Sequence, residues 1–391
     1  MKNHELSMDP TLRLLAACTP LDPDPGGTTA ILQAVAPIQN WNALLEEAEL
    51  QGMAPLLHRA LKTAGLTLED EIRLKLKGMV LRHRLANQVR RQVLIDILAK
   101  ADAANLQPVL VKGAALADLV YPDPALRPMR DMDMLLSAAQ LQPMQQLLLE
   151  MGFAETHPGE LFTHHRHLPT LTKTVDGFKI GIEVHHSLFS VGIGQHWGSM
   201  DELISPLNEY QLAGTSLTAR CLGPEDMLVQ LCSHFNRSGG EYEPLRMMWV
   251  ADLLAFLAAF SARLNWPLLK TSQPQVLSTL AQVHQLTPLP AGLATQLALE
   301  SYPQPAGVGQ PYQGWPNISI EQIKKAGRGQ FLRRTFQPSE WWLALYYGRS
   351  GPFWLWRSRA EHLLRILQRA SQHLLLARNA KITPTTLGAK K

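Results

Sequence analysis

The sequence predicts an α+β protein in which a small mixed β-sheet is flanked by N-terminal helices and a C-terminal helical domain. Apolar residues recur at three- and four-residue spacing over most of residues 10–105 and again from about residue 220, which is typical of helices. Between these parts lie short apolar or alternating segments that are typical of strands. Asp176-Gly177 separates two of them and is the strongest short-range signal for a β-hairpin.

The chain therefore divides into an N-terminal helical segment (1–105), an α/β core (106–215), a C-terminal helical domain (216–385) and a disordered tail (386–391). The expected helices cover 31–36, 41–50, 56–64, 69–105, 141–151, 224–235, 245–264 and 357–378. The expected strands are a run ending at Lys112, a segment at 131–136 and the hairpin 168–185. A Pro/Gly-rich stretch, 302–315, predicts a loop.

Composition excludes some classes of protein. The chain has 391 residues, of which 46% are hydrophobic, so it can bury a large core. No run of about 18 apolar residues predicts a membrane-spanning helix. Cys18, Cys221 and Cys232 show no Cys-x-x-Cys spacing and suggest neither disulfides nor a zinc site. We read Cys18 as a buried residue of an ordinary helix and expect a cytoplasmic location, with peripheral membrane contact left open.

The segment 131–136 alternates acidic and apolar residues. Alternation places Asp131 and Asp133 on one face of a strand and Met132 and Met134 on the other. The two carboxylates are then about 7 Å apart at Cα, which is close enough to bind one divalent cation through oxygen ligands. The pattern therefore predicts a metal site.

Two neighbouring segments could complete this site. Upstream, an apolar run ends at Lys112-Gly113 and passes directly into a helix, so that Gly113 and the first amides of the helix can approach a phosphate. Downstream, the second strand of the hairpin points Glu183 and His185 away from its apolar face. If that strand neighbours the Asp131 strand, three carboxylates meet on one face.

These features resemble the nucleotidyltransferases of the DNA polymerase β superfamily, and more narrowly a bacterial branch of uncharacterised nucleotidyltransferase-like proteins. The resemblance rests on Lys112-Gly113, Arg127, Asp131-x-Asp133 and Glu183-x-His185. It is tight over about 108–136 and 178–188 and looser over about 220–270, through Ser233-His234, Leu245-Arg246, Asp252 and Trp266.

The resemblance implies an enzyme that transfers a nucleoside monophosphate from a nucleoside triphosphate, with ATP the first candidate, and releases pyrophosphate. It implies a small mixed β-sheet nucleotidyltransferase core with Mg²⁺ or Mn²⁺ as cofactor. The acceptor stays open between a small molecule, a peptide or protein, and a glycan or lipid precursor. The implied catalytic and metal-binding residues are Asp131, Asp133 and Glu183, the nucleotide-binding residues are Lys112, Gly113, Ala114, Arg127 and Arg130, and the substrate-side candidates are His185, His234 and Asp252.

Several alternatives stand beside this interpretation. Ala114 replaces the serine that the superfamily uses to contact a phosphate, which favours a catalytically silent module that binds a nucleotide or a partner. Arg127 and Arg130 could instead form ion pairs with the acids of the site in a metal-free protein, and His234 and Asp252 could be satisfied polar groups between helices. The histidines at 164, 165, 167, 185 and 186 allow a zinc interpretation, but more simply they are polar strand residues.

The end of the chain is basic. Residues 324–391 contain 14 Lys/Arg and 2 Asp/Glu, a net charge of +12, against −8 for the rest. Leu363, Leu364, Leu367 and Leu374 share one side of a predicted helix, with arginines on the other. This segment could lie on a membrane surface, contact RNA as part of an RNA-modifying transferase, or pack its leucines on the core.

Overall fold

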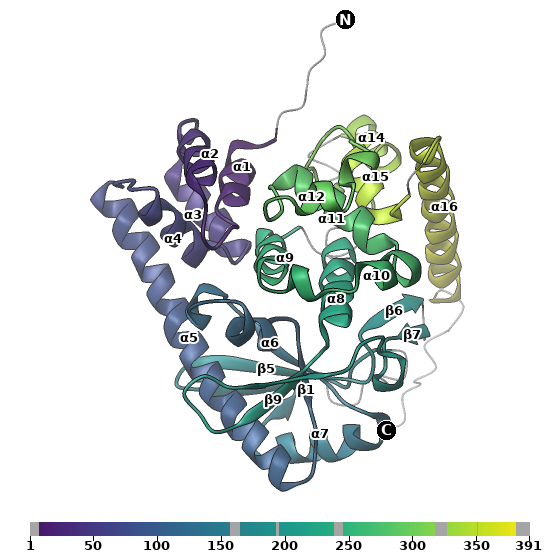
Figure 1. The fold of residues 1–391 in the computed structure, drawn as a ribbon. Helices are drawn as coiled ribbons and strands as arrows, with labels where there is room; N and C mark the ends of the chain where they lie inside the picture. The colour runs from purple at the N-terminus through teal and green to yellow at the C-terminus, as the bar shows by residue number, and fades with distance from the viewer. Residues whose placement is uncertain are drawn as a thin grey trace, which may run out of the picture.

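The computed structural model of this protein describes residues 8–156, 165–192, 195–237, 245–316, 327–349 and 351–380. The tail expected at 386–391 lies outside the described residues. In Figure 1 the sheet lies in the lower part of the molecule, and most of the N-terminal helices and the later helices stand above it as two neighbouring groups. The α+β class predicted from the sequence is confirmed.

The N-terminal helices begin at side-chain caps. Asp9 accepts a hydrogen bond from the amide of Thr11 (2.9 Å), and Asn40 accepts one from the amide of Ala43 (3.0 Å). The 34-residue helix α5 spans about 50 Å and runs along the edge of the sheet (Figure 1). The helices are α1 (Pro10–Ala17), α2 (Pro25–Val35), α3 (Trp41–Leu50), α4 (Ala54–Thr63) and α5 (Asp70–Ala103). Helices α3, α4 and α5 lie where the sequence predicted them, whereas α2 begins six residues before the predicted helix 31–36.

A mixed sheet of seven strands forms the centre, in the order β3-β4-β5-β2-β1-β9-β8. β2 runs parallel to β5 and antiparallel to β1, while β1 runs parallel to β9. The strands are β1 (Val109–Val111), β2 (Asp131–Leu135), β3 (Ala154–Glu155), β4 (Leu171–Val175), β5 (Phe178–His185), β8 (Asn208–Gln211) and β9 (Thr218–Cys221). A separate pair, β6 (Phe189–Gly192) and β7 (Gln195–Trp197), forms a two-stranded sheet.

The predicted hairpin is confirmed. Asp176 and Gly177 both have positive φ (49° and 79°), as a two-residue turn between β4 and β5 requires. The last strand, β9, continues the sheet to Cys221, beyond the division that the sequence suggested at residue 215. Two helices of the core, α6 (Lys112–Leu119) and α7 (Leu141–Glu150), lie above and below the sheet in Figure 1.

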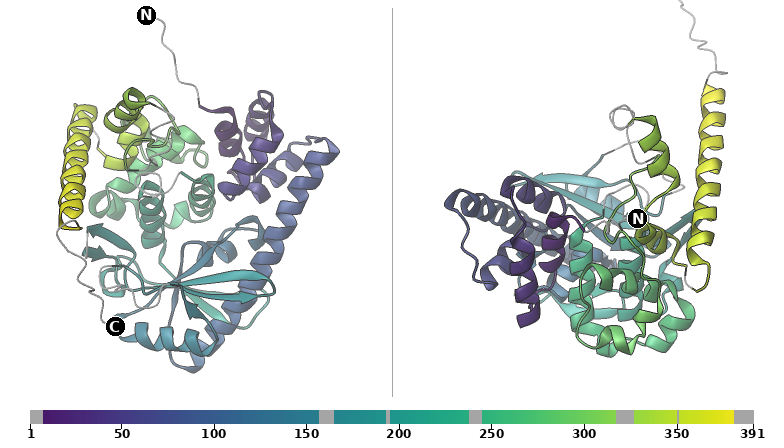
Figure 2. Two further views of the ribbon diagram at one scale, coloured as in Figure 1. Left: turned by 180° about the vertical axis from the view of Figure 1, so that it is seen from behind. Right: turned by 90° about the horizontal axis from the view of Figure 1, so that it is seen from above.

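The C-terminal part is helical and shares one continuous apolar core with the sheet and the N-terminal helices. Its helices are α8 (Pro224–Arg237), α9 (Met247–Phe260), α10 (Trp266–Ser272), α11 (Gln275–Leu286), α12 (Leu293–Gln296), α14 (Arg328–Phe336), α15 (Glu340–Tyr347) and α16 (Trp354–Ala380). The stretch predicted as a loop, 302–315, has no helix or strand. Figure 2 shows α16 at the outer edge of the molecule from both directions.

Taken singly, none of the described helices is both long and apolar enough to cross a bilayer. Two consecutive helical segments, Met247–Arg263 and Trp266–Ser272, are long and apolar enough when taken together, but the chain bends by 115° between them. Most side chains of α9, its first helix, are buried in the core.

Candidate active site

The register between β2 and β5 places the acidic residues. Asp133 lies directly opposite Glu183, and Asp131 lies opposite Gly181. Because side chains alternate along a strand, Asp131, Asp133, Glu183 and His185 all project from one face of the sheet. The adjacency of these two strands, which the sequence left conditional, is confirmed.

A compact cluster forms from Asp133, Glu183 and His185. One ligand atom from each lies within 4.8 Å of the other two. His185 Nε2 is 2.9 Å from Asp133 Oδ1 and 3.3 Å from Glu183 Oε2. Asp133 and His185 are fully buried, while Glu183 is partly exposed. The sequence placed His185 on the substrate side, whereas the structure places it between the two carboxylates.

Asp131 lies one pleat from this cluster and is the more exposed of the two aspartates. Partial burial of its carboxylate, and then the negative charge of Asp133, raise the pKa of Asp131 to about 6. The charge of Glu183 acts in the same direction. The three carboxylates predicted from the sequence are thus near enough to repel one another, although Asp131 is not part of the compact cluster.

Lys112 joins the cluster from the end of β1. Its Nζ lies 2.5 Å from Asp133 Oδ1, and both side chains are largely buried. The Lys112 backbone has a positive φ of 49°, and its amide donates to Gln230 Oε1 of α8 (3.2 Å). Burial alone would raise the pKa of Asp133, but the charges and hydrogen bonds of Lys112 and His185 hold it well below its ordinary value.

Arg127 is held away from solvent by an acid of the C-terminal part. Its Nε and Nη2 donate to the two carboxylate oxygens of Asp252 in α9, at 2.8 and 2.7 Å. The Tyr121 hydroxyl also donates to Asp252 (2.8 Å), and the Asn87 amide donates to the Arg127 carbonyl (2.7 Å). The sequence listed Arg127 with the phosphate-binding residues and Asp252 with the substrate-side candidates; the structure pairs them with each other as a buried ion pair.

Gly113 is required by this ion pair. A Cβ added at Gly113 would lie 1.9 Å from Arg127 Nη1 and 2.6 Å from its Cζ. The sequence explained Gly113 by the approach of a phosphate to the backbone. In the structure, the guanidinium of Arg127 occupies the space next to Gly113.

Ala114, Arg130 and His234 are the other site residues that the sequence predicted. Ala114 is buried, and Arg130 is exposed immediately before β2. His234 in α8 contacts Trp249 edge to face (ring centroids 4.8 Å apart). Burial, and then the positive charge of Lys112, keep the pKa of His234 well below its ordinary value, so its imidazole is neutral at pH 7.

Two contacts were missed by the sequence analysis as parts of this site. The ring of His167 lies 5.1 Å from that of His185, and Tyr121 completes the environment of Asp252. Tyr121 lies in the Tyr-Pro-Asp-Pro loop that follows α6, and nothing in its spacing indicates a partner in α9. Its partner became adjacent only through the packing of the C-terminal helices.

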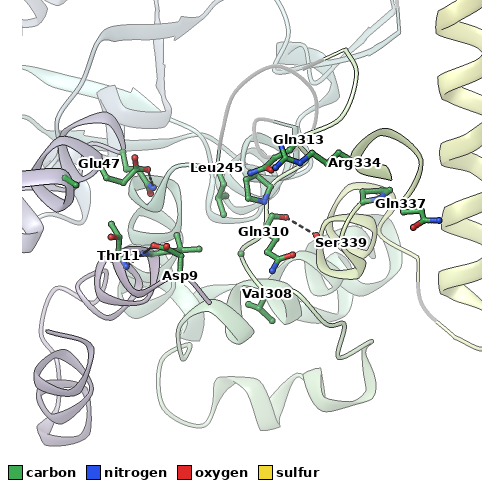
Figure 3. Close-up of a pocket in the computed structure, with 16 residues that line it drawn as sticks. Asp9, Thr11, Glu47, Leu245, Val308, Gln310, Gln313, Arg334, Gln337 and Ser339 are labelled. Carbon is green, nitrogen blue, oxygen red and sulfur yellow. Dashed lines mark hydrogen bonds between the residues drawn. The ribbon is translucent and has the colours of Figure 1, made fainter. Parts of the chain in front are cut away.

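A groove of about 740 Å³ lies elsewhere in the molecule (Figure 3). Residues of the N-terminal helices, including Asp9, Thr11 and Glu47, face Gln310, Gln313, Arg334, Gln337 and Ser339 of the C-terminal part across it. None of its lining residues belongs to the acidic cluster. The groove is therefore separate from the candidate active site.

Comparisons with known proteins identify the family of this chain. A search of curated proteins finds no match. One solved structure with similarity is described as an antigenic nucleotidyltransferase-like protein from Paracoccidioides brasiliensis, with 17% identity and a TM-score of 0.36 over 54% of this chain and 92% of the other. The model of a family described as "Uncharacterised nucleotidyltransferase" matches residues 37–291, more than half of the chain. The segments carrying Lys112, Asp131, Asp133 and Glu183 all lie within that match, and the chain belongs to this family of uncharacterised nucleotidyltransferases.

Proposed function

We propose that this protein is a metal-dependent enzyme that transfers a nucleoside monophosphate from a nucleoside triphosphate to an acceptor hydroxyl or phosphate, with release of pyrophosphate. The observation that carries the proposal is the position of Asp133 opposite Glu183 on adjacent parallel strands, beside the Lys112 ammonium. Membership of the nucleotidyltransferase family supports the same reaction class.

The donor atoms of the cluster fit a divalent cation. Asp133 and Glu183 offer carboxylate oxygens, which suit Mg²⁺ and Mn²⁺, and the imidazole of His185 favours Mn²⁺ of the two. Asp131 would add an oxygen ligand from the same face. The bound cation would neutralise charge on the phosphates of the substrate.

The residues of the chain have distinct tasks in this proposal. Lys112 balances the charge of Asp133. Once Asp133 binds the metal ion, the Lys112 ammonium is placed to bind a phosphate oxygen. Arg130, exposed at the start of β2, is free to approach the outer phosphates. Neutral His234 offers a hydrogen bond to the acceptor without adding charge. Arg127 holds the backbone near Gly113 in place through Asp252 and Asn87.

Labelled nucleoside triphosphates, incubated with the protein, Mn²⁺ or Mg²⁺ and cell extract, test the proposal. We expect pyrophosphate release and a labelled product with the native chain. Asp133→Asn should lose both, because it removes one carboxylate charge from the cluster. Asp176→Asn, in the turn of the β4–β5 hairpin, is the matched control and should keep full activity. Equal activity in native protein and Asp133→Asn would contradict the proposal.

A second function is favoured by one observation. Ala114 is buried and has no hydroxyl to offer a phosphate at the start of α6. A catalytically silent module would bind a nucleotide at the same cluster without turnover. Calorimetry with Mn²⁺-ATP separates the two: heat of binding that Asp133→Asn abolishes, together with no pyrophosphate release from any triphosphate, identifies the silent module.

A further inference from the structure

Helix α16 carries an exposed apolar face. Phe353, just before the helix, and Trp356 are 78% and 72% exposed, and Leu363, Leu364 and Leu367 are between 46% and 59% exposed. On a helical wheel Trp356 and the three leucines fall within about a third of the circumference, and Phe353 comes directly before the helix. Single exposed leucines are ordinary, but a continuous apolar stripe on one helix marks an interaction surface. We call these five residues the α16 stripe.

The other side of α16 accounts for its attachment to the protein. Ser358, His362 and Ile366 are buried, and His362 Nε2 lies 2.7 Å from the carbonyl oxygen of Thr335 at the end of α14. His362 Nδ1 lies 3.2 Å from the Tyr347 hydroxyl of α15. The interpretation in which the leucines pack on the core is therefore wrong for the three described ones, since they point outward. Leu374 lies outside the residues whose side chains are described.

The described side chains of residues 327–371 are predominantly basic. They comprise eight arginines and two glutamates, a net charge of +6. The two acids of this segment, Glu340 and Glu361, are both engaged by arginines: Glu340 by Arg359 (3.4 Å), and Glu361 by Arg365 (3.0 Å) and Arg349. Arg357 lies exposed beside Trp356, and α14, which packs against α16, exposes Arg328 and Arg333.

We propose that the α16 stripe binds the surface of an anionic lipid bilayer. An apolar helix face with arginines beside it suits the boundary between lipid head groups and acyl chains, where the apolar side chains enter the bilayer and the cations meet lipid phosphates. The helix stands at the outer edge of the molecule, so a flat surface can approach it (Figures 1 and 2).

Single-stranded RNA fits this surface less well. RNA binding without base pairing uses aromatic rings on which bases stack. The ring stack nearest to α16 consists of Tyr312, Trp342 and Tyr346, with centroids 4.7 and 4.8 Å apart, and Trp342 is buried. Those rings stack on one another. The stripe itself has two exposed rings, Phe353 and Trp356, but its other three residues are leucines, on which a base cannot stack.

Co-sedimentation of the full chain with vesicles tests the proposal. We expect at least tenfold stronger binding to phosphatidylcholine vesicles that contain 30% phosphatidylglycerol than to pure phosphatidylcholine. L363Q/L367Q should weaken that binding at least tenfold. R357Q should weaken it at low ionic strength and change it little at high ionic strength, because salt screens the attraction between the arginine and the lipid phosphates. L74Q/L81Q on α5, where the two leucines are 61% and 57% exposed, is the matched control and should bind as the native chain does.

Two results would overturn the proposal. One is an absence of binding to the anionic vesicles at low salt by native protein that melts normally. The other is vesicle binding by L363Q/L367Q equal to that of the native chain. A labelled single-stranded RNA should bind at least tenfold more weakly than the vesicles; tighter RNA binding that survives L363Q/L367Q identifies RNA as the partner and also overturns it.

Discussion

Arg127 and Asp252 form a bidentate, buried ion pair that joins the sheet region to the C-terminal helices. Burial by itself would lower the pKa of Arg127, but the carboxylate of Asp252 raises it above its ordinary value, so the guanidinium of Arg127 stays charged. The Arg127 guanidinium lies against Gly113, which follows Lys112 in the chain. The ion pair therefore fixes the position of this part of the candidate active site relative to α9.

Breaking this ion pair should be costly. Arg127→Met leaves the Asp252 carboxylate buried without its main partner, and we expect a loss of about 3–5 kcal/mol in the free energy of unfolding, measured in urea. Arg127→Met/Asp252→Leu should recover part of that loss because no buried charge remains. Arg73→Met, which breaks an exposed pair with Asp70, is the control and should leave the free energy of unfolding almost unchanged, because water and salt screen an exposed ion pair. A double variant no more stable than the single one would contradict the account.

Gly113 should tolerate no side chain. In Gly113→Ala the new methyl group overlaps the Arg127 guanidinium, and we expect a loss of about 1–3 kcal/mol, with lower nucleotide affinity as Lys112 shifts. Gly78→Ala is the matched control, since a Cβ there meets no atom within 4 Å in α5, and it should stabilise the protein by about 0.5–1 kcal/mol. Both values come from denaturation curves. Equal effects of the two substitutions would show that the space beside Gly113 is adjustable.

Lys112 should stabilise the protein in a pH-dependent way. The folded-state pKa of Asp133 lies below its unfolded value, so the stability contributed by its carboxylate is present above pH 4 and is lost as pH falls through the folded-state pKa. Lys112→Met removes a charged hydrogen bond to Asp133 and should cost about 2 kcal/mol at pH 7. The difference between native and variant protein should begin to shrink below about pH 4 and should continue to shrink toward the folded-state pKa of Asp133. Urea denaturation at each pH measures this difference. A difference that does not change with pH would mean that the cost comes from packing alone.

The three cysteines should be inert in the folded protein. Burial raises the pKa of the Cys18 thiol to about 12 and that of Cys221 to about 12, and Cys232 is shifted in the same direction. Because the thiolate is the reactive form, an aromatic disulfide reagent at pH 8 should label none of them in native protein and all three in urea. Rapid labelling of any cysteine without denaturant would place that thiol at the surface.

Local patterns in the sequence were enough to predict much of this molecule. Some features depend only on neighbours a few residues away, so the order of residues predicts them. They are helices α3 and α5, the turn at Asp176-Gly177, and the alternation of Asp131 and Asp133 with methionines. The same alternation placed Glu183 and His185 on one face of their strand. What those residues do in catalysis stays a prediction.

Tertiary structure decided the rest, because it depends on contacts between distant segments. The parallel pairing of β2 with β5 brings Asp133 to Glu183 and inserts His185 between them, at a separation of about fifty residues. The partner of Arg127 is Asp252, 125 residues away, and no local spacing distinguishes that choice from a phosphate. The short strand β9 joins the sheet only because β1 offers it a parallel edge. Whether the leucines of α16 face the core or the solvent follows from which side of the helix α14 and α15 cover.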